Sequence, residues 1–172
     1  MRESTQDQRV RDMMSTDLEL VLSWRNHRDV RRYMYTQHEI SIEEHRGWFE
    51  RSSNDPFKHQ LIFESHGVPL GFINIVVKEQ GGIADWGFYA APVAPKGTGR
   101  KLGSTVLNYC FDKLMLHKVC GQALSFNERS IIFHKSMGFL QEGVLRDQHY
   151  DGENYHAVIC FGLLSHEWNS YR

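Results

Sequence analysis

The alternation of apolar and polar positions predicts strands in the middle of the chain and near its C-terminal end. Residues 59–64 and Val68–Val77 are rich in β-branched and aromatic side chains and flank Ser65-His66-Gly67, which predicts a β-hairpin. Asp151-Gly152 between two further alternating runs is a second hairpin signal. The predicted strands cover residues 10–14, 59–64, 68–77, 83–90, 119–126, 140–150 and 154–164.

Apolar residues three and four positions apart predict helices between these strands. Ser15, Thr16 or Asp17 caps a first helix through Leu18 and Val21, and a short helical piece follows at residues 29–34. Ser41-Ile42-Glu43-Glu44 reads as a capping box that opens a helix ended by Asn54-Asp55-Pro56. Two later helices are expected over residues 102–116 and after Asn127. Helices among strands on this pattern indicate an α/β fold with a mixed sheet.

Length and charge limit the classes of function. At 172 residues the chain is expected to form one domain, residues 1–172, large enough to bury a core. It carries 20 Lys plus Arg and 21 Asp plus Glu, so a broad basic surface for nucleic acid is not expected.

Cysteine content and hydropathy indicate the compartment. Cys110, Cys120 and Cys160 are odd in number and lie in apolar segments, which predicts buried free thiols in a reducing environment. Residues 1–11 are polar and lack the apolar stretch of a secretion signal, and no apolar run approaches the roughly 20 residues of a membrane span. We therefore expect a cytoplasmic protein with no membrane partner.

A glycine- and lysine-rich segment, residues 89–104, joins an apolar strand to the first long helix after it. Glycines let a backbone approach an anion, amides at a helix start point at it, and basic side chains add charge. This pattern predicts a diphosphate site, with candidate residues Lys96, Thr98, Gly99, Arg100, Lys101, Gly103 and Ser104.

The segments that follow carry a family resemblance. Asn127, His134, Gly138-Phe139 and Glu142-Gly143 come after the glycine segment, a helix and a strand, in that order. From about residue 14 to residue 168 the chain resembles the GNAT superfamily of acetyl-CoA-dependent N-acetyltransferases. The resemblance implies a mixed, mostly antiparallel central sheet with splayed strands, flanked by helices. It implies acetyl-CoA as co-substrate, no metal, and direct transfer of acetyl in a ternary complex.

The same resemblance implies where the cofactor lies. Its pantetheine arm would enter between the strand that ends at Phe88, Tyr89 and Ala90 and the strand that begins at Val119. The family's phosphate loop, Gln/Arg-x-x-Gly-x-Gly/Ala, fits two registers here, residues 94–99 or residues 98–103. We prefer the second, because it gives the following helix the expected length before Val119. Neither register begins with Gln or Arg, a contact that nearby basic residues can replace.

Two residues of the second helix are implied to act on the cofactor. Asn127 matches an asparagine that contacts the cofactor arm, although asparagine is also a common helix cap. His134 falls where the family usually has a tyrosine that protonates the leaving thiolate. We expect His134 to be the catalytic acid, the alternative being a histidine packed beside Phe139.

No general base is assigned from the sequence. Asp85 and Glu79 are candidates. Gln122 lies where a relative could use glutamate, but an amide cannot take a proton.

The N-terminal third carries a narrower resemblance, to the nucleotide-amino-sugar N-acetyltransferases of pseudaminic acid biosynthesis. These enzymes acetylate the 4-amino group of a UDP-linked amino-deoxysugar. The predicted substrate residues are Arg25, Met34 and His45: the first and last as donors to phosphate, Met34 in an apolar floor. A structural salt bridge from Arg25 to Glu43 or Glu44 is the alternative for Arg25.

Three functions stay open at this point. The first is N-acetylation of a UDP-linked amino sugar, and the second is acetylation of protein N-termini by an enzyme of the ribosomal-protein type. The third is a non-catalytic acyl-CoA-binding module, because the phosphate loop and the usual tyrosine are altered. The oligomeric state is open too, a homodimer included.

Overall fold

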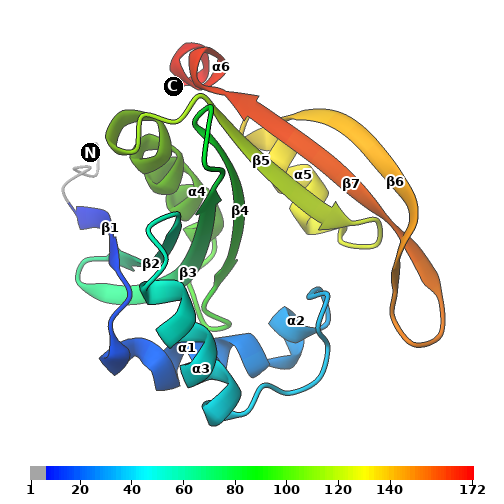
Figure 1. Cartoon of the computed structure of the whole chain (residues 1–172). Coiled ribbons are helices and arrows are strands. Elements are labelled where there is room, and N and C mark those ends of the chain that lie inside the picture. Colours follow the sequence, from blue (N-terminus) through cyan, green and yellow to red (C-terminus); the bar gives the residue numbers. More distant parts are fainter. Residues whose placement is uncertain (1–6) are drawn as a thin grey trace.

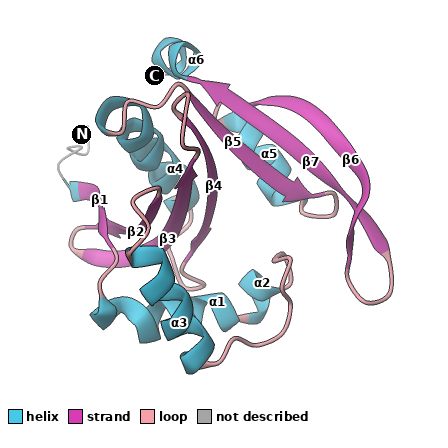
Figure 2. Ribbon diagram, viewed as in Figure 1, coloured by secondary structure: helices cyan, strands magenta, loops and turns pink. Residues whose placement is uncertain are grey.

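The computed structural model describes residues 7–172, and seven strands in this part of the chain form one twisted sheet with helices on both faces (Figures 1 and 2). The strand order is β1-β2-β3-β4-β5-β7-β6, and every neighbouring pair is antiparallel except β4 and β5. The predicted mixed, mostly antiparallel sheet is therefore confirmed. The strands are β1 (Gln8–Asp12), β2 (Lys58–Ser65), β3 (Val68–Val77), β4 (Ile83–Ala90), β5 (Lys118–Leu124), β6 (Leu140–Tyr150) and β7 (Tyr155–Leu164).

The helices largely follow their expected capping signals. Ser41 Oγ accepts a hydrogen bond from the Glu44 amide at 3.1 Å and so caps α3, as the capping box predicts. Asp17 does not cap α1 through its side chain; it pairs with Arg11 and accepts from the Met14 amide instead. The helices are α1 (Leu18–Asn26), α2 (Arg28–Arg31), α3 (Ile42–Ser53), α4 (Thr98–Asn108), α5 (Glu128–Ser136) and α6 (Ser165–Tyr171).

Two helical predictions need correction. The helix expected over residues 102–116 begins earlier, at Thr98, and leaves α-geometry at Asn108 for a π-helical turn, Tyr109–Lys113. Helix α6 was not expected, because its polar sequence SHEWNSY places only one large apolar residue, Trp168, against the core. The N-terminal residues 1–6, part of the polar stretch considered above, lie outside the described chain.

Each face of the sheet carries its own apolar core. On one face α4 and α5 pack on strand residues such as Ile73, Trp86 and Phe161. On the other face α1 and α3 pack on Ile62 and Phe72. The alternation of β3 and β4 side chains between these two clusters follows from the two-residue period of a strand.

Strands β4 and β5 separate soon after they meet. Their parallel pairing covers only Ile83–Asp85 against Lys118–Cys120, and the two strands then diverge (Figure 1). Residues 86–90 of β4 and 121–124 of β5 thus border a gap whose apex lies at Trp86 and Gly121. The predicted splay of these two strands is confirmed.

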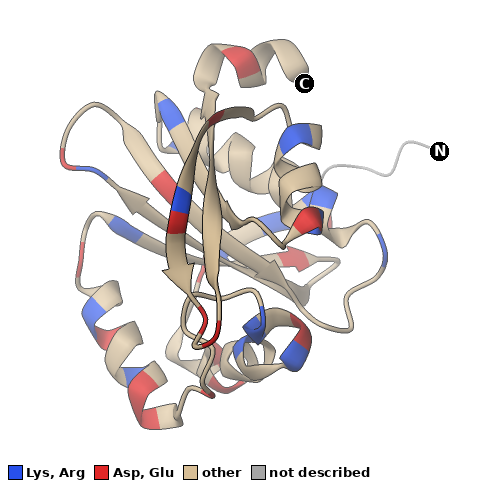
Figure 3. Ribbon diagram, turned by 90° about the vertical axis from the view of Figure 1, so that its right-hand side faces the viewer, with Lys and Arg blue, Asp and Glu red and all other residues tan. Residues whose placement is uncertain are grey.

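The surface charges are mixed in sign. Along α3 acidic Glu43, Glu44 and Glu50 alternate with basic Arg46 and Arg51 (Figure 3). Within residues 7–172, every helix is too short or too polar to cross a bilayer.

Candidate active site

The gap between β4 and β5 brings together the residues predicted to line the cofactor arm. Phe88 points into the α4/α5 cluster, whereas Tyr89 packs on the α1/α3 side. Because both strands lose their mutual pairing here, backbone amides and carbonyls on the gap edges are available to an inserted chain. An extended pantetheine arm, which carries amide groups of its own, fits such an edge.

The glycine segment starts α4 with a left-handed residue. Gly97 has φ of 89° and is the N-cap, and the helix proper begins at Thr98. Thr98 is buried, and both its amide and its hydroxyl donate to the Pro95 carbonyl. The Thr98 amide is therefore engaged, and the amides of Gly99 and Arg100 are the ones at this helix start that a diphosphate could contact.

This geometry favours the other of the two loop registers. Residues 98–103 lie inside α4, and only residues 94–99 place their glycines at the loop–helix boundary. Gly103 is instead a packing glycine: a Cβ there would lie 2.7 Å from Cζ of Phe133. The preference for residues 98–103 rested on the expected length of the helix, and that length differs because a π-helical turn, which the sequence did not predict, follows α4.

The other loop residues lie around this helix start. Lys96, Arg100 and Lys101 are exposed, and Ser104 is half-buried in the second turn. Arg100 donates to the Tyr171 hydroxyl at 3.0 Å, so its guanidinium is directed toward α6. The roles of these residues in phosphate binding stay predictions.

Asn127 caps α5. Its Oδ1 accepts a hydrogen bond from the Ser130 amide at 3.2 Å, which satisfies one of the unpaired donors at the helix start. Asn127 is therefore a helix cap, the alternative role considered for it above, and its contact with the cofactor arm stays a prediction.

His134 is enclosed in an aromatic layer beneath the gap. Only 2% of it is exposed, and its ring stacks on Phe161 with centroids 4.8 Å apart. Its Nε2 lies 3.2 Å from Trp86 Nε1 and its Nδ1 lies 2.8 Å from the Ser130 carbonyl oxygen. Burial lowers the pKa of the imidazole, and the bond with Ser130 opposes this in part. These surroundings favour a neutral imidazole with both nitrogens engaged over a proton donor.

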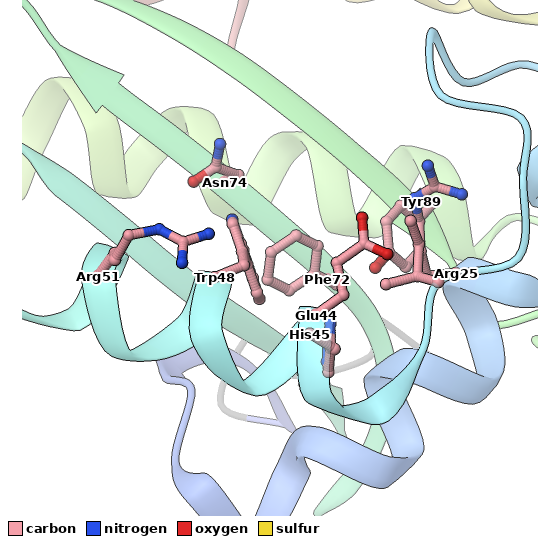
Figure 4. Close-up of a pocket in the computed structure, with 9 residues that line it drawn as sticks. Arg25, Glu44, His45, Trp48, Arg51, Phe72, Asn74 and Tyr89 are labelled. Atoms are coloured by element: carbon pink, nitrogen blue, oxygen red, sulfur yellow. The ribbon is translucent and has the colours of Figure 1, made fainter.

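The substrate half contains a cavity of about 370 Å³ between α3 and the sheet. In Figure 4, Arg25, Glu44 and Tyr89 gather at one end and Arg51 lies at the other, with Trp48 and Phe72 between them. Burial raises the pKa of the Tyr89 phenol. The lining residues are Arg25, Ile40, Glu44, His45, Trp48, Arg51, Phe72, Asn74 and Tyr89.

Two of the predicted substrate residues meet in this cavity. Arg25 uses Nη2 to donate to the Thr36 carbonyl at 2.7 Å, and its buried Nη1 has no partner. His45 Nε2 is likewise buried without a partner. Burial lowers the pKa of both groups, and no ion pair joins Arg25 to Glu43 or Glu44 in residues 7–172. The salt-bridge alternative for Arg25 is thus not seen.

Met34 lies elsewhere. It is half-buried in the turn after α2 and is not part of the cavity lining. Asn74 does line it and was missed, although a polar residue in the apolar run of β3 was a usable signal. Asn26, whose side chain joins both backbone groups of Ile40 at 2.8 Å, shapes the loop beside the cavity.

The candidate bases are not grouped at the cavity. Asp85 is at the last paired position of β4, at the closed end of the gap, and Glu79 precedes that strand. Gln122 accepts a hydrogen bond from the Tyr35 hydroxyl at 2.9 Å. Among residues 7–172, no three His, Cys, Asp or Glu side chains gather in a way that could hold a metal ion.

Comparisons with known proteins agree with this architecture. The family described as "Acetyltransferase (GNAT) domain" matches residues 9–140. "Acetyltransferase PseH" of Campylobacter jejuni is 27% identical over 131 residues, 74% of this chain and 80% of the relative. "Putative ribosomal N-acetyltransferase YdaF" of Bacillus subtilis is 35% identical over 63 residues, 37% of this chain and 34% of the relative. A crystal structure of spermidine N-acetyltransferase from Vibrio cholerae, in complex with CoA and spermine, superposes with a TM-score of 0.87 at 20% identity, covering 95% of this chain and 99% of that one.

Proposed function

This chain belongs to the acetyltransferase (GNAT) domain family, and from that premise we propose that it acetylates the 4-amino group of a UDP-linked amino-deoxysugar. It is an acetyl-CoA-dependent N-acetyltransferase; the acceptor is what is proposed. The relative PseH, similar over 80% of its length, supports a place in pseudaminic acid biosynthesis, which supplies sugars for flagellin glycosylation. The predicted cytoplasmic location suits a soluble nucleotide-sugar acceptor.

The observation that carries the proposal is a pair of buried nitrogens without partners on two residues that line the cavity. A buried guanidinium nitrogen and a buried imidazole nitrogen without partners leave polar groups unsatisfied, which costs about 1–3 kcal/mol each. An anion between Arg25 and His45 would satisfy both. A diphosphate is the anion that a nucleotide sugar offers, and a guanidinium fork binds it well.

The cavity disfavours a polyamine acceptor. Its lining contributes two arginines, Arg25 and Arg51, against the single carboxylate of Glu44. A spermidine cation would meet net positive charge there. The structural likeness to spermidine N-acetyltransferase, at 20% identity, therefore supports the fold and not that acceptor.

Acetylation of protein N-termini remains the second candidate. The similarity to YdaF covers 37% of this chain and supports this alternative only in part. A basic protein tail would need an acidic groove, and the described cavity does not have one.

The chain's own residues supply binding and orientation. Acetyl-CoA provides the acetyl group as a thioester, and the products are an amide and a free thiol. The gap between β4 and β5 holds the arm by its backbone edges, and the amides that begin α4 take the diphosphate. Arg25 and His45 would hold the nucleotide so that the sugar amine points from the cavity toward that gap.

The test is an assay of acetyl-CoA with a panel of UDP-4-amino-sugars, read as free thiol. We expect turnover with a UDP-linked sugar, and inhibition by UDP that competes with the sugar nucleotide but not with acetyl-CoA. Arg25→Ala should weaken sugar-nucleotide binding by roughly 1.5–3 kcal/mol, about ten- to a hundredfold. Arg25→Lys should restore only part of this, because a point charge lacks the bidentate fork.

Arg46→Ala is the matched control, because Arg46 is exposed on α3 next to His45 and does not line the cavity. It should leave the affinity for the sugar nucleotide unchanged. No inhibition by UDP, together with acetylation of a peptide N-terminus, would replace the sugar proposal with the protein one.

A further inference from the structure

The apex of the gap is occupied by two side chains that hydrogen-bond to each other. Trp86 is the first β4 residue after pairing with β5 ends, and Gly121 is its counterpart on β5. The Trp86 indole lies 3.2 Å from the His134 imidazole, nitrogen to nitrogen. A Cβ on Gly121 would lie 2.4 Å from His134 Nε2 and 2.8 Å from Trp86 Nε1. The two rings therefore fill the space that a side chain at position 121 would take.

The partners of His134 fix its tautomer. An indole N–H can only donate, so His134 Nε2 must accept from Trp86. A carbonyl oxygen can only accept, so His134 Nδ1 carries the proton and donates it to Ser130. Adding a proton to Nε2 would break the bond with Trp86 and leave a charge in an aromatic layer.

Aromatic rings, rather than charged side chains, surround His134 in the described part of the chain. The rings packed on it belong to β4, α5, the turn between α5 and β6, and β7: Trp86, Phe88, Phe133, Phe139 and Phe161. In residues 7–172, burial lowers the pKa of His134 and the hydrogen bond with Ser130 raises it, and no acidic side chain contributes to the shift.

We propose that Trp86 and His134 are a positioning pair that sets the separation of β4 and β5 at the apex of the gap, with His134 neutral throughout the reaction. The bond joins β4, one wall of the gap, to α5, the helix that follows the other wall. Because both rings are also packed in the core, the bond holds the walls at one distance. His134 then replaces the family's usual tyrosine in position but not as the acid.

The proposal rests on the acetyl-transfer part of the proposed function and not on the identity of the acceptor. The experiment compares His134→Gln with His134→Phe. Glutamine offers an acceptor oxygen near the place of Nε2 and does not titrate, whereas phenylalanine offers no acceptor and leaves the buried Trp86 N–H unsatisfied. We expect His134→Gln to turn over within about tenfold of the wild type, and His134→Phe to be at least about tenfold slower than His134→Gln.

The pH profile distinguishes the two roles. An acid must be protonated, so its loss would appear as a fall in kcat when pH rises through its pKa. We expect the profiles of the wild type and His134→Gln to superimpose. If both variants lose roughly 10²–10⁴-fold and the alkaline fall disappears with them, His134 is the acid and the proposal is overturned.

A measurement without any acceptor keeps this result separate from the sugar proposal. In ¹⁵N-labelled wild-type protein, His134 should show a bare Nε2 and a protonated Nδ1 near pH 7. Trp86→Phe should shift the Nε2 resonance and raise the calorimetric Kd for acetyl-CoA. Phe139→Leu, which removes a ring from the same layer but no hydrogen bond, should lower Tm without shifting that resonance pattern. A protonated Nε2 in the wild type would refute the proposal even if no acceptor has been found.

Discussion

At the scale of single residues, the site depends on nitrogen atoms that the fold buries and leaves without partners. Arg25 is held by the bond from its Nη2 to Thr36, and its Nη1 is left buried without a partner. His45 is oriented by a hydrogen bond with the backbone of Leu18. Desolvating such groups costs stability in the free protein, and a bound anion recovers that cost.

His45 predicts a pH dependence of acceptor binding. In the neutral ring the nitrogen bonded to Leu18 carries the proton, so Nε2 must gain one before it can donate to phosphate. Burial lowers its pKa, so most molecules are neutral near pH 7 and binding takes up a proton. Affinity for the sugar nucleotide should therefore rise as pH falls from about 7.5 to about 6, by up to about tenfold per pH unit.

Calorimetry across this pH range checks the slope. The diphosphate of a UDP-sugar does not titrate here, so the slope belongs to the protein. His45→Gln, whose amide can donate without taking up a proton, should bind with an affinity independent of pH. A flat profile in the wild type would show that Nε2 does not contact the phosphate.

At the scale of elements, the two glycines of the loop and helix have different tasks. Gly97 needs a left-handed backbone, which an L-residue adopts at a cost of about 1–2 kcal/mol. Gly103 needs the absence of a side chain against Phe133. Gly97→Ala should weaken CoA binding by roughly five- to thirtyfold, whereas Gly103→Ala should lower stability by about 1–3 kcal/mol through overpacking.

Calorimetric CoA affinity and urea unfolding of both variants separate these effects. If Gly103→Ala, rather than Gly97→Ala, lost CoA affinity without losing stability, the phosphate loop would be assigned to residues 98–103 instead.

The sequence predicted most elements because their signals are local. Strands β3, β4 and β6 match their alternating patterns to the residue, and Ser41 caps α3 as its box indicates. The errors concern features set by packing. A π-helical turn after α4 and a glycine pressed on Phe133 depend on neighbours far along the chain. The Trp86–His134 bond joins residues 48 positions apart and had no sequence signal.

At the scale of the whole molecule, histidines that are buried or half-buried make stability sensitive to mild acid. Burial lowers the pKa of His45, His59 and His134. The unfolded chain, with a histidine pKa of about 6.5, then binds more protons than the folded one below that pH. The contribution of these histidines to the free energy of unfolding should be complete above about pH 6.5. It should fall as pH drops toward their lowered pKa values in the folded protein, by up to about 1.4 kcal/mol per pH unit for His134.

Urea unfolding at about pH 7.5 and about pH 5.5 measures this loss. His134→Gln should reduce the difference between the two values, because glutamine does not titrate. An equal difference in the wild type and the variant would mean that His134 does not contribute. The ion pairs of Arg11 with Asp17 and Glu64 hold the pKa of those carboxyls low, so their loss belongs to more acidic solutions.

The placement of the tryptophans has an optical consequence. The chain has four tryptophans, and each lies in a different environment. Trp24 is a buried residue of α1, Trp48 lines the proposed acceptor cavity, and Trp86 is at the apex of the gap. Trp168 is on α6, and its indole is hydrogen-bonded to Asn108. Indole emission responds to the polarity around the ring. In variants that retain one tryptophan at a time, light from position 48 would report the acceptor and light from position 86 the thioester arm, so the order in which the two substrates bind could be followed without any added dye.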